Sequence, residues 1–158
     1  MGRMYRVSFT AYSLTAAGDF FEIVAASNKP IRLHEVVITQ STEAGDAAAE
    51  QMKIEIKRAT SGFTSGSGGS SGTVTPLDSA DAAAGATAEV KNTTQAAAGS
   101  GALTTIQTRN VHVANGFHYL PTPECQEVFR PTEACIVSLG AAPADSITFD
   151  GHAIFEEF

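Results

Sequence analysis

Apolar and polar residues alternate along much of the chain with a period of two, which is the period of a half-buried β-strand. Residues 5–12 show this pattern first, with Tyr12 on the polar face and an apolar face made of Tyr5, Val7, Phe9 and Ala11. A turn at residues 16–19 is followed by an apolar run at residues 20–26. We predict a second strand there, pairing back on the first.

The strongest strand signal covers residues 31–42. Three consecutive apolar residues at 36–38 indicate burial on both faces, as in a central strand of a sandwich. Glu35 shares a face with Leu33 in this pattern, so it needs a polar partner or a position at an edge. Residues 42–50 then form a polar, alanine-rich connection.

The strand predicted at residues 51–60 is apolar on one face only. Its inward side chains are Met52, Ile54 and Ile56, and its outward side chains are Lys53, Glu55 and Lys57. Neighbouring charges of opposite sign along one face support each other, so we expect a solvent-facing charge ladder on this strand.

Residues 61–101 form a long insertion that is rich in glycine, serine and alanine and begins with the tract SGFTSGSGGSSG. Such a composition buries too little apolar surface to offset its ordering entropy, so we expect a flexible loop or arm with one short strand near residues 86–95. Long insertions of this kind in compact domains are often binding segments. The candidate partner-contact residues are Phe63, Thr64, Val74, Leu77 and Val90.

Strand patterns resume at Leu103 and continue to the end of the sequence, at residues 111–113, 117–120, 128–129, 135–139 and 147–155. The pair Asn115-Gly116 favours a tight hairpin between the first two of these. Gly151 indicates a bulge in the last. Many short strands and no convincing long helix predict an all-β, antiparallel β-sandwich of jelly-roll type, with residues 1–158 as a single domain.

Composition excludes several functional classes. A net charge of −7 and a pI near 5.0 disfavour a nucleic-acid-binding surface. No apolar run approaches the roughly 18 residues of a membrane span. The first ten residues lack the apolar core of a signal peptide, so we expect synthesis in the cytoplasm. Cys125 and Cys135 are too few for a disulfide framework.

Candidate catalytic and metal-binding motifs are weak. Residues 68–72 match G-x-S-x-G around Ser70, and Asp145 and His152 follow in the order of a hydrolase triad. However, no buried strand precedes Ser70 and no helix follows it, and a glycine–serine tract produces this match by chance. We therefore predict a protein that is not an enzyme and has no cofactor.

His112 and His118 are candidate metal ligands that could face each other across the Asn115-Gly116 hairpin, joined by His34 or His152. No spacing typical of a metal site supports them, and we interpret them as outward-facing sheet residues. The aspartates, including Asp19, are interpreted as turn caps. Glu156 and Glu157 are interpreted as a solvated chain end.

Three blocks of sequence resemble a family of small virion proteins in tailed phages and prophages: LHEVVITQSTEAGDAAAEQMKIEIKRAT at 33–60, YLPTPE at 119–124 and APADSITFDG at 142–151. The resemblance implies a β-sandwich that decorates and cements the outside of a capsid. It implies the major capsid protein and copies of the chain itself, as a homotrimer, as partners. The resemblance implies no catalytic residue in this sequence.

We therefore expect a structural protein of the virion, located on the capsid exterior, whose residues 61–101 contact neighbouring subunits and become ordered on assembly. We also expect that these residues can be deleted without unfolding the sandwich. One alternative is a tail protein or a host-surface adsorption protein. Another is a carbohydrate-binding sandwich, which the absence of tryptophan and the presence of only three tyrosines disfavour.

Overall fold

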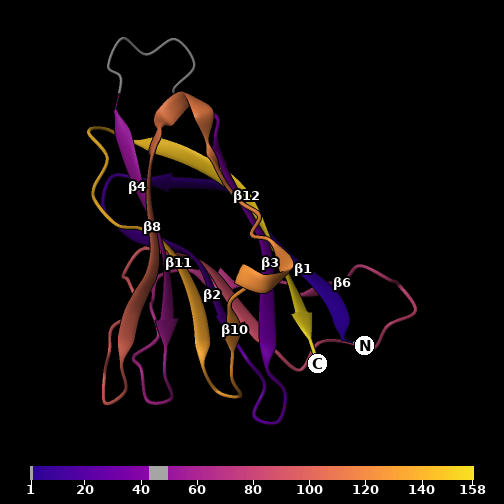
Figure 1. The fold of residues 1–158 in the computed structure, drawn as a ribbon. Helices are drawn as coiled ribbons and strands as arrows, with labels where there is room; N and C mark the ends of the chain where they lie inside the picture. Colours follow the sequence, from indigo (N-terminus) through magenta and orange to yellow (C-terminus); the bar gives the residue numbers. More distant parts are fainter. Residues whose placement is uncertain (1, 43–49) are drawn as a thin grey trace.

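The computed structural model describes residues 2–42 and 50–158, which form two antiparallel β-sheets packed face to face (Figure 1). Sheet A has the order β10 (Val128–Phe129), β3 (Ile31–Gln40), β12 (Ile147–Glu157), β1 (Arg3–Leu14) and β6 (Thr75–Pro76), and β9 (Phe117–Tyr119) also pairs with β3. Sheet B has the order β5 (Ser70–Ser71), β7 (Thr87–Asn92), β2 (Gly18–Val24), β11 (Ala134–Leu139), β4 (Gln51–Ala59) and β8 (Leu103–His112). Two single-turn 3-10 helices, η1 (Val113–Asn115) and η2 (Pro123–Cys125), complete the described elements. The predicted antiparallel β-sandwich is confirmed.

Long strands that follow each other in the sequence mostly lie in opposite sheets. The prediction that residues 20–26 pair back on the first strand is therefore wrong, since β1 pairs with β12 and β6 while β2 pairs with β11 and β7. The hairpin predicted at Asn115-Gly116 is wrong for the same reason, because β8 pairs with β4 and β9 pairs with β3. Turn residues reverse the chain equally well within one sheet and between two facing sheets, so the local signal did not distinguish these cases.

Aromatic side chains fill the space between the sheets. The ring of Phe20 lies 5.8 Å from that of Phe9, in a stacked arrangement, and 5.1 Å from that of Phe149, edge to face. Phe21 and Tyr12 also contact the Phe9 ring, at 5.1 and 6.0 Å. Aromatic pairs in these geometries add to the stabilisation given by area burial alone.

The faces predicted for Ala11 and Tyr12 are wrong, because β1 contains a bulge next to them. The pairing with β12 shifts register between Phe9 and Tyr12, so that Tyr12 is buried and Ala11 is exposed with a positive φ of 53°. The amide of Ala11 donates a hydrogen bond of 2.9 Å to Asp150 Oδ1, which lies opposite the bulge. The bulge predicted at Gly151 in the last strand is therefore wrong, because the extra residue of this strand pair lies on β1.

β4 follows its sequence pattern closely, but the pairing of β3 with β12 shifts register between Leu33 and Glu35. Leu33 is therefore buried, while Glu35, predicted on the same face, is half-buried on the other. The buried side chains of β3 lie mainly on one face, while Val37 on the other face is half-buried, so burial on both faces is only partial. Met52, Ile54 and Ile56 of β4 are buried as predicted. Of the connection predicted at residues 42–50, positions 43–49 lie outside the described residues.

A bulge in β2 determines which way its acidic residues point. Val137 pairs with Phe21 and Ser138 pairs with Asp19, so Phe20 is the extra residue. Phe20 and Phe21 are therefore both buried in the core. Asp19 and Glu22 lie on the outer face of sheet B, where the insertion covers them.

Truncation of Phe20 tests the aromatic core. We expect Phe20→Ala to lower the free energy of unfolding by about 3–5 kcal/mol, because it leaves a cavity where three aromatic rings meet. Urea denaturation measures the change. Phe158→Ala is the matched control, since Phe158 is 44% exposed, and it should cost about 1 kcal/mol or less. Equal losses in the two variants would contradict the placement of Phe20 at the centre of the core.

Candidate interaction surface

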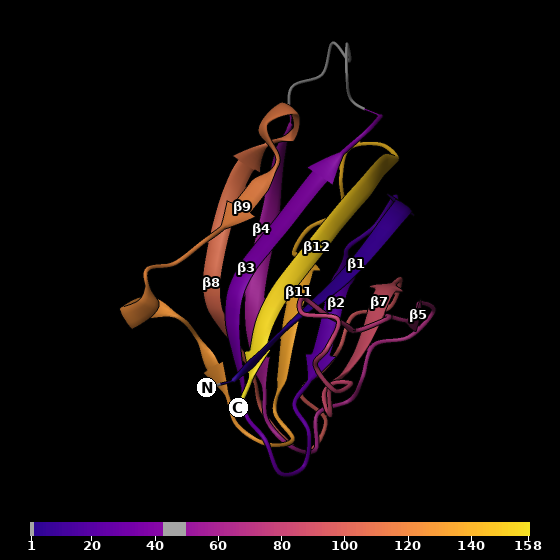
Figure 2. The ribbon, with the colours of Figure 1, turned by 90° about the vertical axis from the view of Figure 1, so that its right-hand side faces the viewer.

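One ribbon of the insertion lies on the outer face of sheet B as a third layer. Residues 63–67 and 94–97 pair with each other through the bridges Thr64–Ala97 and Ser67–Thr94. Phe63 packs on a small apolar cluster that is separate from the main core and consists of Ala59, Ala96, Ala134 and Ile136. Beyond this ribbon, β7 extends sheet B (Figure 2) and β6 extends sheet A (Figure 1).

The extended arm expected for residues 61–101 is therefore wrong, while the short strand expected near residues 86–95 is confirmed as β7. Backbone pairing and buried small side chains replace the large apolar residues that the segment lacks. Gly66, for example, is buried where a Cβ atom would lie 2.7 Å from Asn92 Nδ2 and from the carbonyl oxygen of Thr94. Glycine here allows the ribbon to approach the sheet closely.

Two buried carboxylates of β2 hold this ribbon. Glu22 accepts hydrogen bonds from the hydroxyl of Ser65 at 2.5 Å and from the amide of Gly66 at 2.9 Å. Asp19 accepts from the amide of Ala96 at 2.7 Å. Burial raises the pKa of both carboxyl groups, and these hydrogen bonds reduce the effect without reversing it. Asp19 is thus an anchor inside a strand, and its interpretation as a turn cap is wrong.

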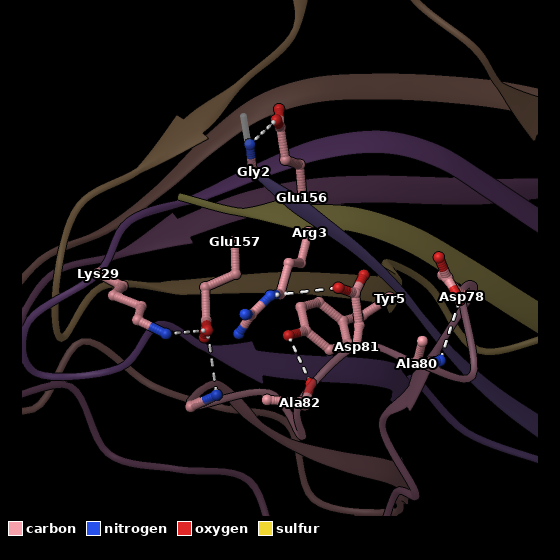
Figure 3. Close-up of polar contacts among 11 residues, drawn as sticks. Gly2, Arg3, Tyr5, Lys29, Asp78, Ala80, Asp81, Ala82, Glu156 and Glu157 are labelled. Atoms are coloured by element: carbon pink, nitrogen blue, oxygen red, sulfur yellow. Dashed lines mark hydrogen bonds and ion pairs between the residues drawn. The ribbon is translucent and has the colours of Figure 1, made fainter.

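A third carboxylate, from the last strand, anchors the far part of the insertion (Figure 3). Glu157 accepts hydrogen bonds from Lys29 Nζ at 2.9 Å, from the amide of Ala86 at 2.8 Å and from the amide of Gly85 at 3.2 Å. Burial alone would raise its pKa, but these donors outweigh burial and the pKa lies below its ordinary value. Glu157 is only 3% exposed, so its interpretation as a solvated end is wrong.

The turn after β6 presents an apolar side chain to solvent. The amide of Leu77 donates to the carbonyl of Met4 at 2.9 Å, while its side chain is 47% exposed. Arg3 and Asp81 form an ion pair at 3.3 Å, and the Tyr5 hydroxyl donates to the carbonyl of Ala82 at 3.0 Å (Figure 3). These contacts fix the backbone around Leu77 against β1.

The predicted partner-contact residues divide according to their exposure. Val90 is buried in the main core and cannot touch a partner, so this prediction is wrong. Phe63 and Val74 are half-buried and pack on the two apolar clusters. Thr64 and Leu77 are exposed, so they alone of the five present their side chains fully to the surface.

The candidate catalytic residues are far apart in the fold. Ser70 lies in β5, at one end of sheet B, while His152 lies on β12 beside Glu35, with His152 Nε2 and Glu35 Oε2 3.8 Å apart. No nucleophile–base pair of the kind a hydrolase needs forms between Ser70 and His152.

Two of the candidate metal ligands, His118 and His152, lie on either side of Glu35, whereas His112 lies apart from them. His118 Nε2 lies 2.9 Å from Glu35 Oε1, which gives Glu35 the partner that the sequence pattern required. His112 accepts a hydrogen bond from the amide of Ala114, so His112 and His118 do not face each other across a hairpin. Within residues 2–42 and 50–158, no group of three or more His, Cys, Asp or Glu side chains could hold a metal ion.

Sequence reasoning missed the three anchoring carboxylates. A usable signal was present, because Glu22 directly follows two phenylalanines in an apolar strand, where a charged residue needs a buried partner. Most of their partners are backbone amides of distant residues, namely Gly66, Gly85, Ala86 and Ala96, and backbone amides leave no side-chain signature.

Comparisons of the chain with protein-family models, curated proteins and solved structures gave no match. In the described part of the chain, no helix has the length and apolar character needed to cross a membrane.

Removal of the Glu157 carboxylate tests the anchor at residues 85–86. We expect Glu157→Ala to cost about 1–3 kcal/mol of stability, because it leaves buried amides without an acceptor. Hydrogen exchange measured by NMR should show faster exchange at Gly85 and Ala86. Glu124→Ala, at an exposed position in η2, is the control and should change neither quantity.

The same anchor should depend on pH. Since the pKa of Glu157 is lowered from 4.5 in the folded protein, its stabilising contribution is complete above pH 4.5 and is lost as the pH falls through the folded-state value. Glu157→Ala should therefore differ most from the wild type at neutral pH. A stability difference that grows on acidification would contradict this anchor.

Glu22 should show the opposite dependence. Its pKa is raised from 4.5 on folding, so the folded state retains the proton to higher pH than the unfolded chain. The free energy of unfolding therefore decreases as the pH rises from 4.5 through the folded-state pKa of Glu22. The Glu22→Gln variant has no carboxyl group to titrate, so its stability does not fall in this way. Urea unfolding should therefore show that the variant becomes more stable relative to the wild type from pH 4 to pH 7. A constant difference would show that Glu22 titrates alike in both states.

Proposed function

We propose that this protein is a non-enzymatic structural component of a tailed-phage virion, which decorates the capsid exterior and cements neighbouring subunits of the major capsid protein, acting as a homotrimer. The observation that carries the proposal is the first half of the insertion: residues 61–77 are held on the sandwich and present a surface of mostly small, uncharged side chains. The resemblance of three sequence blocks to small phage virion proteins supports the same role.

The surface chemistry of the insertion suits contact with other protein subunits. No charged residue occurs from Thr60 to Leu77, so covering this surface removes no ion from water. The segment is also hydrogen-bonded to the sandwich before any partner is present. Docking therefore orders less of the chain than a free arm would require, which favours affinity.

We further assign the sandwich to the jelly-roll type. The strand orders β9-β3-β12-β1 and β8-β4-β11-β2 support this assignment, because two interleaved Greek keys produce such an alternation. The insertion then falls in the connection between the fourth and fifth long strands, β4 and β8. A jelly roll serves many functions, so the assignment concerns topology alone.

Deletion of residues 61–101 is not a suitable test, contrary to the expectation from the sequence. It would remove β7 from its pairing with β2 and would take Ala88 and Val90 out of the core. We expect this deletion to destabilise the sandwich itself, so a loss of binding would not be informative.

A point substitution tests the proposal more sharply. Purified protein should bind undecorated capsids and raise the temperature at which they release their contents. We expect Leu77→Asp to weaken binding about tenfold, since it places a charge in the apolar contact. Ala141→Asp, in the exposed turn between β11 and β12, is the control and should bind as the wild type does.

Electron microscopy of decorated particles then locates the protein. Density on the capsid exterior beside the major capsid protein is the expected result. Density on the tail would favour the alternative role in the tail or in host adsorption, and absence of binding to any part of the particle would refute the structural role.

A further inference from the structure

The Asn115-Gly116 pair, which does not form the predicted hairpin, lies where the chain crosses from sheet B to sheet A. It follows from η1, between β8 and β9, at one end of the sandwich (Figure 2). Two buried side chains, Val113 and Phe117, fix the chain on either side of it. The pair therefore spans a short crossing between two fixed points.

The fold requires glycine at position 116. Gly116 has a φ of 67°, a left-handed conformation that residues with a Cβ atom rarely adopt. A Cβ atom added here would also lie 2.9 Å from the carbonyl oxygen of Ile38 in β3. Backbone conformation and close packing therefore both disfavour any larger residue at this position.

The side chain of Asn115 has no comparable structural role. It is exposed and makes no hydrogen bond with residues 2–42 or 50–158. The cap of η1 comes instead from His112, whose ring accepts a hydrogen bond from the amide of Ala114 at 3.2 Å. The side-chain amide of Asn115 is therefore free to turn toward the backbone of Gly116.

An asparagine that precedes glycine can react with its own backbone. The nitrogen of Gly116 attacks Cγ of Asn115 and forms a cyclic imide, while the proton of this nitrogen leaves with the side-chain amino group as ammonia. A water molecule then opens the ring at either of its two carbonyl groups. One product is aspartate, and the other is isoaspartate, in which the main chain runs through the former side chain. Glycine favours the attack because it has no Cβ atom to hinder it.

The fold restrains two other positions where such a ring could form. Asn92 is 1% exposed, and its side chain donates a hydrogen bond to Glu89. Asp150, the only aspartate that precedes a glycine, accepts a hydrogen bond of 2.9 Å from the amide of Ala11. It also lies in β12, which is paired on both sides. Ring closure at either position would break contacts within the sandwich.

The two remaining asparagines, Asn28 and Asn110, are exposed but precede residues that have a Cβ atom. Asn110 also lies in β8, whose pairing with β4 fixes its backbone. Asn115, by contrast, belongs to a single 3-10 turn, which is held by few hydrogen bonds and opens locally to let the ring close. Of the four asparagines, Asn115 alone combines an exposed side chain with a following glycine.

We propose that Asn115 is a self-modification site of the folded protein, where attack by the backbone of Gly116 releases ammonia and water completes the conversion to aspartate or isoaspartate. Either product adds a negative charge to the crossing. Isoaspartate also adds one carbon atom to the main chain between Val113 and Phe117. Phe117 is 2% exposed and β9 pairs with β3, so the added length disturbs packing and pairing there. The proposal does not depend on a role in the virion.

The test follows the full-length, folded protein during incubation at mildly alkaline pH in water enriched in heavy oxygen. Proteolysis in ordinary water and mass spectrometry then locate the oxygen taken up. We expect conversion at Asn115 with one solvent oxygen incorporated, about tenfold or more faster than at Asn28 or Asn110. Chromatography should separate two products of equal mass. Asn115→Gln, whose larger ring forms less readily, should abolish the conversion.

A matched comparison separates the effect of charge from that of chain length. Asn115→Asp carries the charge without the added carbon atom, and it should unfold at the temperature of the wild type because the position is exposed. The isoaspartate form, isolated by chromatography, should unfold at a lower temperature. Its amides at residues 117–119 should also exchange faster with solvent, as measured by NMR.

Three results would overturn the proposal. One is the absence of conversion at Asn115 in the folded protein, and a peptide of residues 112–118 incubated in parallel shows whether the fold prevents it. Another is equal conversion at Asn28, Asn110 and Asn115. The third is a conversion that persists in Asn115→Gln, because this places the reaction elsewhere in the chain. None of these measurements involves capsids, so the proposed structural role keeps its own test.

Discussion

The arrangement of the insertion depends on two carboxylates that the bulge in β2 turns outward. Because Phe20 is the extra residue, both phenylalanines enter the core, and Asp19 and Glu22 face away from it. Backbone amides of residues 66 and 96 then become their hydrogen-bond donors. A segment too poor in apolar residues to fold alone is in this way fixed as a third layer. A strand without the bulge would point one of these groups into the core and lose the attachment.

The pKa values of the three anchoring carboxylates shift in different directions because their surroundings differ. Glu157 has an ammonium group, Lys29, among its donors, and its pKa is lowered. Asp19 and Glu22 accept mainly from neutral donors, and burial raises the pKa of both. A carboxylate with a raised pKa is held in its ionised form at a cost, whereas folding favours the ionised form of Glu157.

The sequence predicted the strands far better than their partners. Strict alternation placed Met52, Ile54 and Ile56 correctly, because a one-sided strand carries its own signature. Both predicted hairpins failed, since pairing across the sandwich is fixed by contacts between residues distant in the sequence. The flexible insertion was predicted from its lack of large apolar side chains, but a chain can also be ordered by other contacts. Alanine, glycine and backbone pairing ordered it here, with Glu22 as the one side-chain signal available.

The insertion adds short strands to the edge of the sandwich opposite β8, and this placement follows from the topology. The insertion adds β5 and β7 to one end of sheet B and β6 to the corresponding end of sheet A, whereas β8 ends the other side. Short strands of the insertion therefore end one side of the sandwich, and the long strand β8 ends the other. The two sides differ in structure, so a surface that suits one neighbour does not suit the other.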